Sequence, residues 1–462
     1  MNRNTESGLL DTGSLLKIHI VGIGGAGMRA IALVLASMGH EITGSDLKNS
    51  AGLDRLTAEG ISVTIGHSAN NLGEVDLVTR STAISDANIE IRMAMKKNIQ
   101  IVSRAEILTA ITSIKSTIAV AGTHGKTTTS SMLAVALTHA GLNPSFVIGG
   151  EVNEIGCGAL WKDTSKILIV EADESDGTFL KLDSDYAIIT NIEPDHLEHY
   201  GGEAGLRSAF SQFLGNVQKK SFICADDVGA REFLGSEKVT TYGVDPEADY
   251  VIENYEGSRF SSKFSIKGPY GELGEFTVAT PGVYNARNAT AAIVFGDHLG
   301  ADIDLLRKGL AQFAGVARRF HFRGERNGVS FVDDYAHLPT EVESVLEAIE
   351  EGQWGRVVCV FQPHRYTRTS ELWQDFSHSF ENTDVLFITG IYAAGEAPIP
   401  GISGRLIADA VKDSFPEKQV IYCEHRDDLL EEIKSKLVSG DVCVTLGAGD
   451  ITTLPNELTL GG

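Results

Sequence analysis

Short apolar, β-branched runs alternate with helical patterns of hydrophobic residues from Leu16 onward. The run Lys17–Val21 is typical of a strand, Met28–Met38 of a helix, and Glu41–Gly44 of the next strand. This order is the one expected of a parallel sheet wrapped by helices. We therefore predict an α/β protein whose first domain, residues 1–111, is doubly wound and Rossmann-like.

A fresh strand at Ser116–Ala121 opens a second segment, which continues with strand candidates at Lys166–Val170, Tyr186–Thr190 and Ser221–Ala225. Between residues 249 and 280 the pattern changes to alternating runs broken by turns, at Phe260–Ile266 and Glu275–Ala279. Alternation of this kind favours an antiparallel excursion. We predict a central α/β domain over residues 112–319.

The alternation of strands and helices restarts at Val329–Val332, after two helical stretches. Each later strand candidate is followed by a loop and a helical pattern, at Arg356–Phe361, Val385–Thr389, Gln419–Tyr422 and Val442–Leu446. This pattern predicts a third domain, again Rossmann-like α/β, over residues 320–462.

Composition and charge narrow the class of protein. The 462 residues include 39 Lys plus Arg against 62 Asp plus Glu, a net charge of −23, which argues against nucleic-acid and acidic-membrane partners. No apolar run approaches the roughly 18 residues of a membrane span. The five cysteines are scattered and form no Cys-x-x-Cys pair. The stretch Met1–Ser14 has no secretory pattern, and we expect a loose tail on a cytoplasmic protein with free thiols.

The first glycine-rich turn follows the first predicted strand. Gly22, Gly24, Gly25 and Gly27 lie between that strand and a helix, where the backbone can approach a diphosphate at the positive helix end. Asp46 follows the next strand, where an acid can accept hydrogen bonds from a ribose. The pattern fits NAD, FAD or a nucleotide sugar, so alone it also permits a dehydrogenase.

The central segment carries a second and more specific turn, Gly122-Thr-His-Gly-Lys-Thr-Thr-Thr129, again between a strand and a helix. Backbone N–H groups of such a turn cradle phosphate oxygens, the lysine reaches the β and γ phosphates, and the first threonine can bind Mg²⁺. The loop is short, because only Thr123 and His124 separate its glycines.

Acidic residues follow the next central strand as Glu171-Ala-Asp-Glu-Ser-Asp176. One of these carboxylates can hold a Mg²⁺ that bridges phosphates, whereas others, Glu174 among them, are expected to be solvated. His196 follows a further strand and shares the predicted sheet edge, which favours a metal or substrate role.

Two strand ends of the third segment carry histidine and arginine, as Asp333-Asp-Tyr-Ala-His-Leu-Pro339 and Gln362-Pro-His-Arg-Tyr-Thr-Arg-Thr369. Paired arginines beside a histidine can clamp a carboxylate or steady a phosphate. The segments Tyr392–Glu396 and Gly447–Asp450 also follow strands and can line the same crevice.

These motifs resemble those of the Mur ligases of peptidoglycan synthesis, and the similarity spans nearly the whole chain. It rests on residues 22–28, 122–129, 171–176, 362–369 and 392–396. The resemblance implies a first domain for a UDP-sugar, a central P-loop ATPase domain and a C-terminal domain for an amino acid. It further implies ATP-dependent attachment of L-alanine to the lactyl carboxylate of UDP-N-acetylmuramate through an acyl phosphate, with ATP and Mg²⁺ as cofactors. Such a ligase serves cell-wall synthesis, and hence cell shape and division.

The resemblance also implies roles for individual residues. The UDP-sugar would be bound by Gly22, Gly24, Gly25, Gly27, Asp46, His67, Ser81, Thr82 and Ala83. ATP would be bound by Gly122, Thr123, His124, Gly125, Lys126, Thr127, Thr128, Asn288 and Arg319, and magnesium by Thr127, Glu171 and His196. The amino acid would be bound by His337, His364, Arg365 and Arg368, with catalysis by Lys126, His196, His364 and Arg365.

Some points stay open on sequence alone. Either His196 or His364 can take the proton from alanine. Asn288 can instead be a polar residue on an exposed helix face. Where the family commonly has a glycine and a second histidine, this chain has Ala336 and Leu338. The competing functions are a recycling ligase that attaches a whole peptide to the same UDP-sugar, a folate-type glutamate ligase, an NAD-dependent dehydrogenase and a nucleotide-sensing protein.

Overall fold

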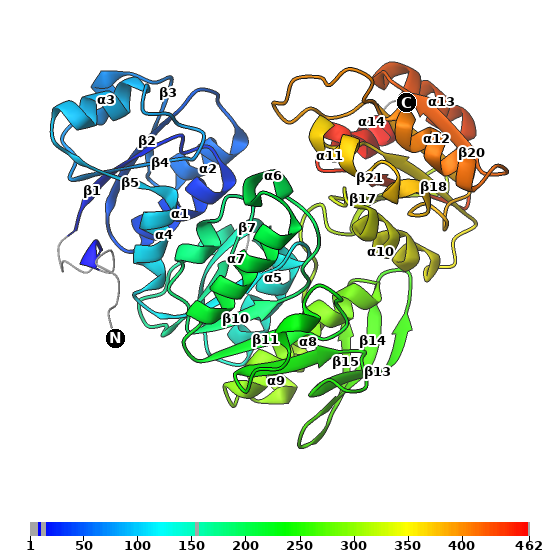
Figure 1. Cartoon of the computed structure of the whole chain (residues 1–462), viewed down its shortest axis with the longest axis horizontal. Helices are drawn as coiled ribbons and strands as arrows, with labels where there is room; N and C mark the ends of the chain where they lie inside the picture. Colours follow the sequence, from blue (N-terminus) through cyan, green and yellow to red (C-terminus); the bar gives the residue numbers. More distant parts are fainter. Residues whose placement is uncertain (1–7, 11–14, 153–156, 461–462) are drawn as a thin grey trace. The chain divides into compact units, whose positions relative to one another are not determined.

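The computed structural model describes residues 8–10, 15–152 and 157–460 (Figure 1). Its strands form three sheets, of five, ten and six strands, and the α/β class is confirmed. By contacts the chain divides into two compact units. The first comprises residues 1–253, 265–276 and 287–313, and the second comprises residues 254–264, 277–286 and 314–462.

The first sheet has the strand order β3-β2-β1-β4-β5, and all its neighbours are parallel. Its strands are β1 (Lys17–Val21), β2 (Glu41–Asp46), β3 (Ser62–Ile65), β4 (Leu77–Arg80) and β5 (Gln100–Ser103). The connecting helices are α1 (Ala26–Ser37), α2 (Ala51–Ala58), η2 (Ala69–Leu72), α3 (Ile89–Lys96) and α4 (Arg104–Thr112). The order reverses between β1 and β4, which is where open α/β sheets place their ligands.

Alternating side chains of this sheet supply two cores. Ile18 and Ile20 of β1 pack with Ile31 and Leu35 of α1. On the other face, Val21 and Val78 pack with Ile91 of α3. Burial on both faces explains why these parallel strands are apolar runs and not alternating ones.

The second sheet has the order β15-β14-β13-β12-β11-β10-β6-β9-β7-β8. Its strands are β6 (Ser116–Ala121), β7 (Ser145–Val152), β8 (Cys157–Leu160), β9 (Ile167–Glu171), β10 (Tyr186–Ile189), β11 (Lys220–Cys224), β12 (Val239–Gly243), β13 (Tyr250–Gly257), β14 (Ser262–Gly268) and β15 (Gly271–Val278). The helices are α5 (Lys126–His139), η3 (Thr178–Lys181), α6 (Leu197–Tyr200), α7 (Glu203–Asn216), η4 (Arg231–Phe233), α8 (Val283–His298) and α9 (Ile303–Ala311). β6 pairs in parallel with β9 and β10, so the ends of these three strands meet at one edge. Two residues join β14 to β15, a link short enough only for a hairpin, which confirms the antiparallel excursion.

The third sheet has the order β16-β17-β21-β18-β19-β20, parallel except for β16. Its strands are β16 (His321–Arg326), β17 (Val329–Asp334), β18 (Arg356–Phe361), β19 (Val385–Thr389), β20 (Gln419–Cys423) and β21 (Asp441–Leu446). Helices α10 (Pro339–Glu350) and α12 (Arg405–Ser414) pack on one face, and α13 (Arg426–Lys436) and α14 (Leu454–Leu460) on the other. The remaining helices of this segment are α11 (Tyr366–Leu372), η5 (Asp375–Ser377) and η6 (Asp450–Thr453).

The structure corrects the prediction of a loose tail at Leu9 and Leu10, because Leu9 is partly buried and packs against the core that contains Leu10. Leu10 is buried in the core of the first unit, whereas residues 1–7 and 11–14 lie outside the described residues. The free thiols are confirmed for four buried cysteines, and the side chain of Cys157 lies outside the described part. Among the described helices, none combines the length and apolar content needed to cross a membrane.

Candidate active site

The turn between β6 and α5 is shaped by two glycines in the left-handed region. Gly122 has φ +136° and Gly125 has φ +77°. A Cβ at Gly122 would collide with the Thr190 hydroxyl and lie 2.8 Å from the Asn191 carbonyl oxygen, so a side chain has no room there. Among the residues that the structure describes, no side chain caps α5 and no acid lies in its first turn. The positive helix end is therefore available to an anion.

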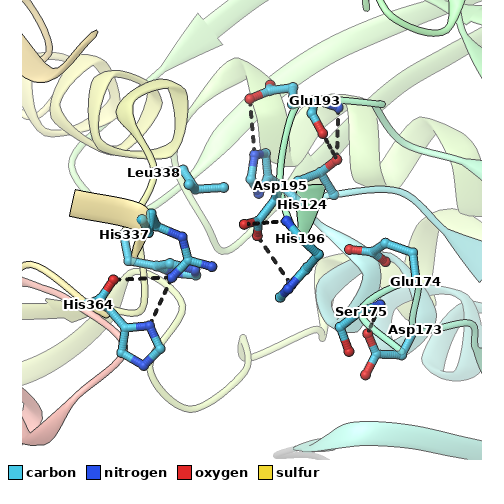
Figure 2. Close-up of polar contacts among 12 residues, drawn as sticks. His124, Asp173, Glu174, Ser175, Glu193, Asp195, His196, His337, Leu338 and His364 are labelled. Carbon is cyan, nitrogen blue, oxygen red and sulfur yellow. Dashed lines mark hydrogen bonds and ion pairs between the residues drawn. The ribbon is translucent and has the colours of Figure 1, made fainter. Parts of the chain in front are cut away.

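The segment after β10 holds this phosphate loop in shape. The His124 amide donates to Asn191 Oδ1 at 2.8 Å, and the Glu193 amide donates to Thr123 Oγ1 at 2.8 Å. His124 Nε2 lies 3.2 Å from Glu193 Oε2, and a dashed line marks this contact in Figure 2. The two residues that separate the glycines are therefore fixed from the neighbouring strand.

Lys126 forms a buried ion pair with Glu174. Its Nζ lies 2.8 and 3.0 Å from the two carboxylate oxygens, and the Glu174 side chain is 4% exposed. Burial raises the pKa of Glu174 to about 7 although Lys126 opposes this shift. Burial opposes the lysine charge, yet Glu174, Asp173 and Glu171 raise the pKa of Lys126 above its ordinary value. The expectation of a solvated Glu174 is wrong, because its side chain packs inward against the phosphate loop.

Thr127 and Glu171 come together at the start of α5. The Thr127 hydroxyl donates to Glu171 Oε1 at 3.1 Å, and Glu171 Oε2 accepts from the Gly149 amide at 2.8 Å. A hydroxyl and a carboxylate are hard oxygen donors of the kind Mg²⁺ prefers, so these two residues fit the predicted ion.

His196 is the third predicted magnesium ligand. It has φ 54°, and its Nε2 lies 3.3 Å from Asp195 Oδ2 (Figure 2). Within the described ranges no group of three or more His, Cys, Asp and Glu side chains is arranged to hold a metal. The role of His196 stays a prediction.

Asn288 on α8 lies beside the phosphate loop. Its side-chain oxygen accepts from the Thr129 hydroxyl at 3.1 Å and would lie 2.8 Å from a Cβ built at Gly125. The residue is 7% exposed, so the alternative of an exposed helix face is wrong. Contact with adenine stays a prediction.

The first glycine loop is closed by Asp46. Gly22 has φ +77° and its amide donates to the Ser45 carbonyl at 2.8 Å, while the Gly24 amide donates to Asp46 Oδ2 at 2.8 Å. The Ser81 amide donates to the Val21 carbonyl at 3.0 Å. Glycine loop, acid and β4 end therefore meet at the switch point of the first sheet.

Behind this loop lies a buried acid that sequence reasoning missed. Glu90 is fully buried and accepts hydrogen bonds from Ser45 Oγ at 2.5 Å and Asn71 Nδ2 at 2.6 Å, and His67 Nδ1 lies 3.5 Å away. Burial opposes its charge, but hydrogen bonds from His19, Ser45, Ser68 and Asn71 lower the pKa of Glu90 to about 2. Its charge therefore stabilises the fold above the ordinary glutamate pKa of 4.5, and that contribution is lost as the pH falls toward 2.

One cavity joins the glycine loop to the carboxylates of the central sheet. Its volume is about 300 Å³, and its walls include Glu171, Asp173, Arg104 and four predicted UDP-sugar residues, Gly25, Gly27, Ser81 and Thr82. The other five predicted residues, Gly22, Gly24, Asp46, His67 and Ala83, lie outside this wall. A ligand in the cavity would extend from the start of α1 to Glu171, a predicted magnesium ligand.

The second unit brings the predicted amino-acid residues together. His364 Nδ1 lies 2.9 Å from Arg368 Nη1, and the His337 and His364 ring centroids are 5.5 Å apart. The Arg365 amide donates to the Tyr392 carbonyl at 2.9 Å, and the Tyr392 ring stacks on His364 with centroids 5.8 Å apart. The ends of β17, β18 and β19 therefore share one cluster, which includes Tyr392, a residue singled out only weakly by the sequence.

The remaining predicted residues of this unit have other partners. Arg319 Nη1 lies 3.7 Å from Glu341 Oε1, and Arg319 Cζ lies 4.9 Å from the centre of the Tyr335 ring. Its contact with ATP stays a prediction. Ala336 and Leu338 are 1% and 2% exposed, so the positions where the family has glycine and histidine are filled by buried apolar groups.

Three family descriptions match successive parts of the chain. They are "Mur ligase family, catalytic domain" over residues 17–115, "Mur ligase middle domain" over 120–296, and "Mur ligase, glutamate ligase domain" over 318–449. A UDP-N-acetylmuramate–L-alanine ligase of Agrobacterium fabrum is 42% identical over 96% of both chains. The chain belongs to the Mur ligase family.

Further comparisons agree with this assignment. A UDP-N-acetylmuramate–L-alanine ligase of Myxococcus xanthus is 42% identical over 99% of this chain and 98% of its own. The crystal structure of the UDP-N-acetylmuramate-alanine ligase of Thermotoga maritima superimposes with a TM-score of 0.80 at 30% identity, covering 96% of this chain and 99% of that one. The predicted family and the three-domain α/β fold are confirmed, and the chain is an ATP-dependent amide-bond-forming ligase.

Proposed function

We propose that this Mur ligase joins L-alanine to the lactyl carboxylate of UDP-N-acetylmuramate during peptidoglycan precursor synthesis. The proposal rests on the cavity that is lined both by Gly25 and Gly27 of the first glycine loop, which we call the sugar-nucleotide loop, and by Glu171 beside the phosphate loop. The relatives of similar length that bear the name of this activity support it. A cytoplasmic location and a contribution to cell shape and division are parts of the same proposal.

The three domains divide the work between them. Residues 1–111 bind the UDP-sugar, residues 112–319 bind ATP, and residues 320–462 bring the amino acid. Arg365 and Arg368 hold the carboxylate of L-alanine or steady the transferring phosphate, since paired arginines suit either anion. His337 and His364 line the same cluster.

The reaction has two steps. A lactyl carboxylate oxygen attacks the γ-phosphorus of ATP and ADP leaves, which gives an acyl phosphate. His196 or His364 first accepts a proton from the ammonium group of L-alanine. The free amine then attacks the acyl carbon, and the bond to phosphate breaks as the departing phosphate takes the second proton of the nitrogen. Lys126 and the start of α5 neutralise the charge on the phosphates, so the protein acts mainly by positioning and by electrostatics.

Thr127 and Glu171 would hold Mg²⁺, with His196 as the predicted third ligand. When bound, the ion supplies positive charge to the phosphate oxygens. The 3.1 Å contact between Thr127 Oγ1 and Glu171 Oε1 supports this assignment.

Phosphate release tests the function directly. With ATP, Mg²⁺ and UDP-N-acetylmuramate present, we expect rapid release only when L-alanine is added, and slower release with glycine or L-serine. Discrimination against glycine rests on about one methyl group, roughly 10- to 100-fold. Release that depends on an L-alanyl peptide and not on free L-alanine would instead identify a recycling ligase.

A further inference from the structure

Arg104 occupies a notable position in the cavity of the first unit. It is the first residue of α4 and follows the end of β5. The charged side chains in the cavity wall are Arg104, Glu171 and Asp173, so Arg104 is the single cation among the described residues that line it.

The stability of α4 does not explain an arginine at this place. The first turn of a helix carries partial positive charge, which disfavours a cation there. Ser103 and Glu106 already form a capping box at this helix start. The capping is therefore complete without Arg104, and a neutral residue would serve the helix better.

The guanidinium is held in place but keeps donors available. Its Nη1 donates to Asp176 Oδ2 at 3.2 Å, while Nε is buried and has no acceptor among the described residues. The group lies against the first turn of α1, where a Cβ at Gly27 would come within 3.0 Å of Nη2. The absence of a side chain at Gly27 therefore makes room for the Arg104 guanidinium. A guanidinium has five N–H donors.

We propose that Arg104 binds the lactyl carboxylate of the sugar nucleotide and holds it beside Glu171. This inference rests on the proposed function. A carboxylate that enters this cavity meets Glu171 and Asp173, whose like charge would repel it, and Arg104 offsets that repulsion with a planar pair of donors. The diphosphate has another partner in the start of α1, where the described part of the chain supplies neither an acid in the first turn nor a side-chain cap.

Two sugar nucleotides separate the roles of Arg104. UDP-N-acetylglucosamine has the same nucleotide, diphosphate and amino sugar as UDP-N-acetylmuramate but no lactyl group. In calorimetric titrations of the full chain without ATP, Arg104→Gln should weaken binding of UDP-N-acetylmuramate about 10- to 100-fold and change binding of UDP-N-acetylglucosamine by less than about 3-fold. Arg104→Lys, which keeps the charge but not the paired donors, should lose an intermediate amount.

A matched control removes the partner of Arg104 but keeps the cation. Asp176→Asn breaks the ion pair and retains the oxygen that accepts from the Thr178 amide at 3.0 Å. Its affinity for UDP-N-acetylmuramate should stay within about 3-fold of the wild type or increase. In steady-state kinetics, Arg104→Gln should raise the KM for UDP-N-acetylmuramate and leave the KM for ATP unchanged.

Three results would overturn the inference. An equal loss for both sugar nucleotides would assign Arg104 to the diphosphate, and no loss for either would give it no part in binding. A loss in Asp176→Asn as large as in Arg104→Gln would make the ion pair a structural support. Failure of the proposed function looks different, because the wild-type chain would then release no phosphate in response to L-alanine.

Discussion

Replacing Lys126 with alanine is expected to slow ligation by about 10³-fold or more while UDP-N-acetylmuramate still binds. The reason is that Lys126 supplies the fixed positive charge of the phosphate loop, and removal of such a charge from a buried phosphoryl-transfer site costs several orders of magnitude. The sugar-nucleotide loop belongs to a different sheet and keeps its hydrogen bonds. Phosphate release and calorimetric binding of the sugar nucleotide measure the two effects.

Lys219→Ala is the matched control for this variant. Lys219 directly precedes β11 of the second sheet. Its side chain is 52% exposed and forms an ion pair with Asp185. The control should keep normal turnover. Near-normal turnover in Lys126→Ala would show that the lysine, and with it the phosphate-loop assignment, has been misjudged.

Glu174→Gln is expected to destabilise the nucleotide-free protein by about 3 kcal/mol and to tighten binding of a non-hydrolysable ATP analogue about 10-fold. The substitution removes the partner of a buried lysine, whose Nζ lies 2.8 Å from Glu174 Oε2. In the wild type the triphosphate must compete with Glu174 for Lys126, and in the variant it need not. Thermal unfolding and calorimetry, each with and without the analogue, measure the two effects.

A control variant separates this competition from a general change of charge. Glu193→Gln removes the same charge from a carboxylate that contacts His124 in the phosphate loop. It should give no gain in affinity for the analogue. If Glu174→Gln bound the analogue more weakly than the wild type, Glu174 would be holding Lys126 in its productive position and the competition would be disproved.

The phosphate loop could be predicted from the sequence because its signals are local. Gly122, Gly125 and Lys126 lie within five residues, and the strand before them and the helix after them are continuous patterns. The same holds for the apolar runs that were predicted as strands in all three sheets, whereas β3, β4, β5, β7, β8, β12 and β13 were not predicted. β16 was missed because its sequence, His-Phe-Arg-Gly-Glu-Arg, is polar and belongs to an edge strand with little buried surface.

Contacts between distant residues could not be predicted in this way. Glu174 lies 48 residues from Lys126, and Asn288 lies 159 residues from Thr129, so neither burial is visible in a local pattern. Glu174 was expected to be solvated because the sequence does not distinguish a buried acid from an exposed one within the run Glu171–Asp176. Arg104 was not predicted, and a cation at the first position of a helix is the one signal that could have pointed to it.

In the proposed reaction, a carboxylate oxygen of the sugar nucleotide attacks the γ-phosphorus of ATP and leaves with the phosphate. Ligation with UDP-N-acetylmuramate labelled with ¹⁸O at both carboxylate oxygens, followed by mass spectrometry of the inorganic phosphate, tests it most directly. We expect each phosphate released in the presence of L-alanine to carry one ¹⁸O atom. Unlabelled phosphate, formed at the same rate as the amide, would contradict the acyl-phosphate route.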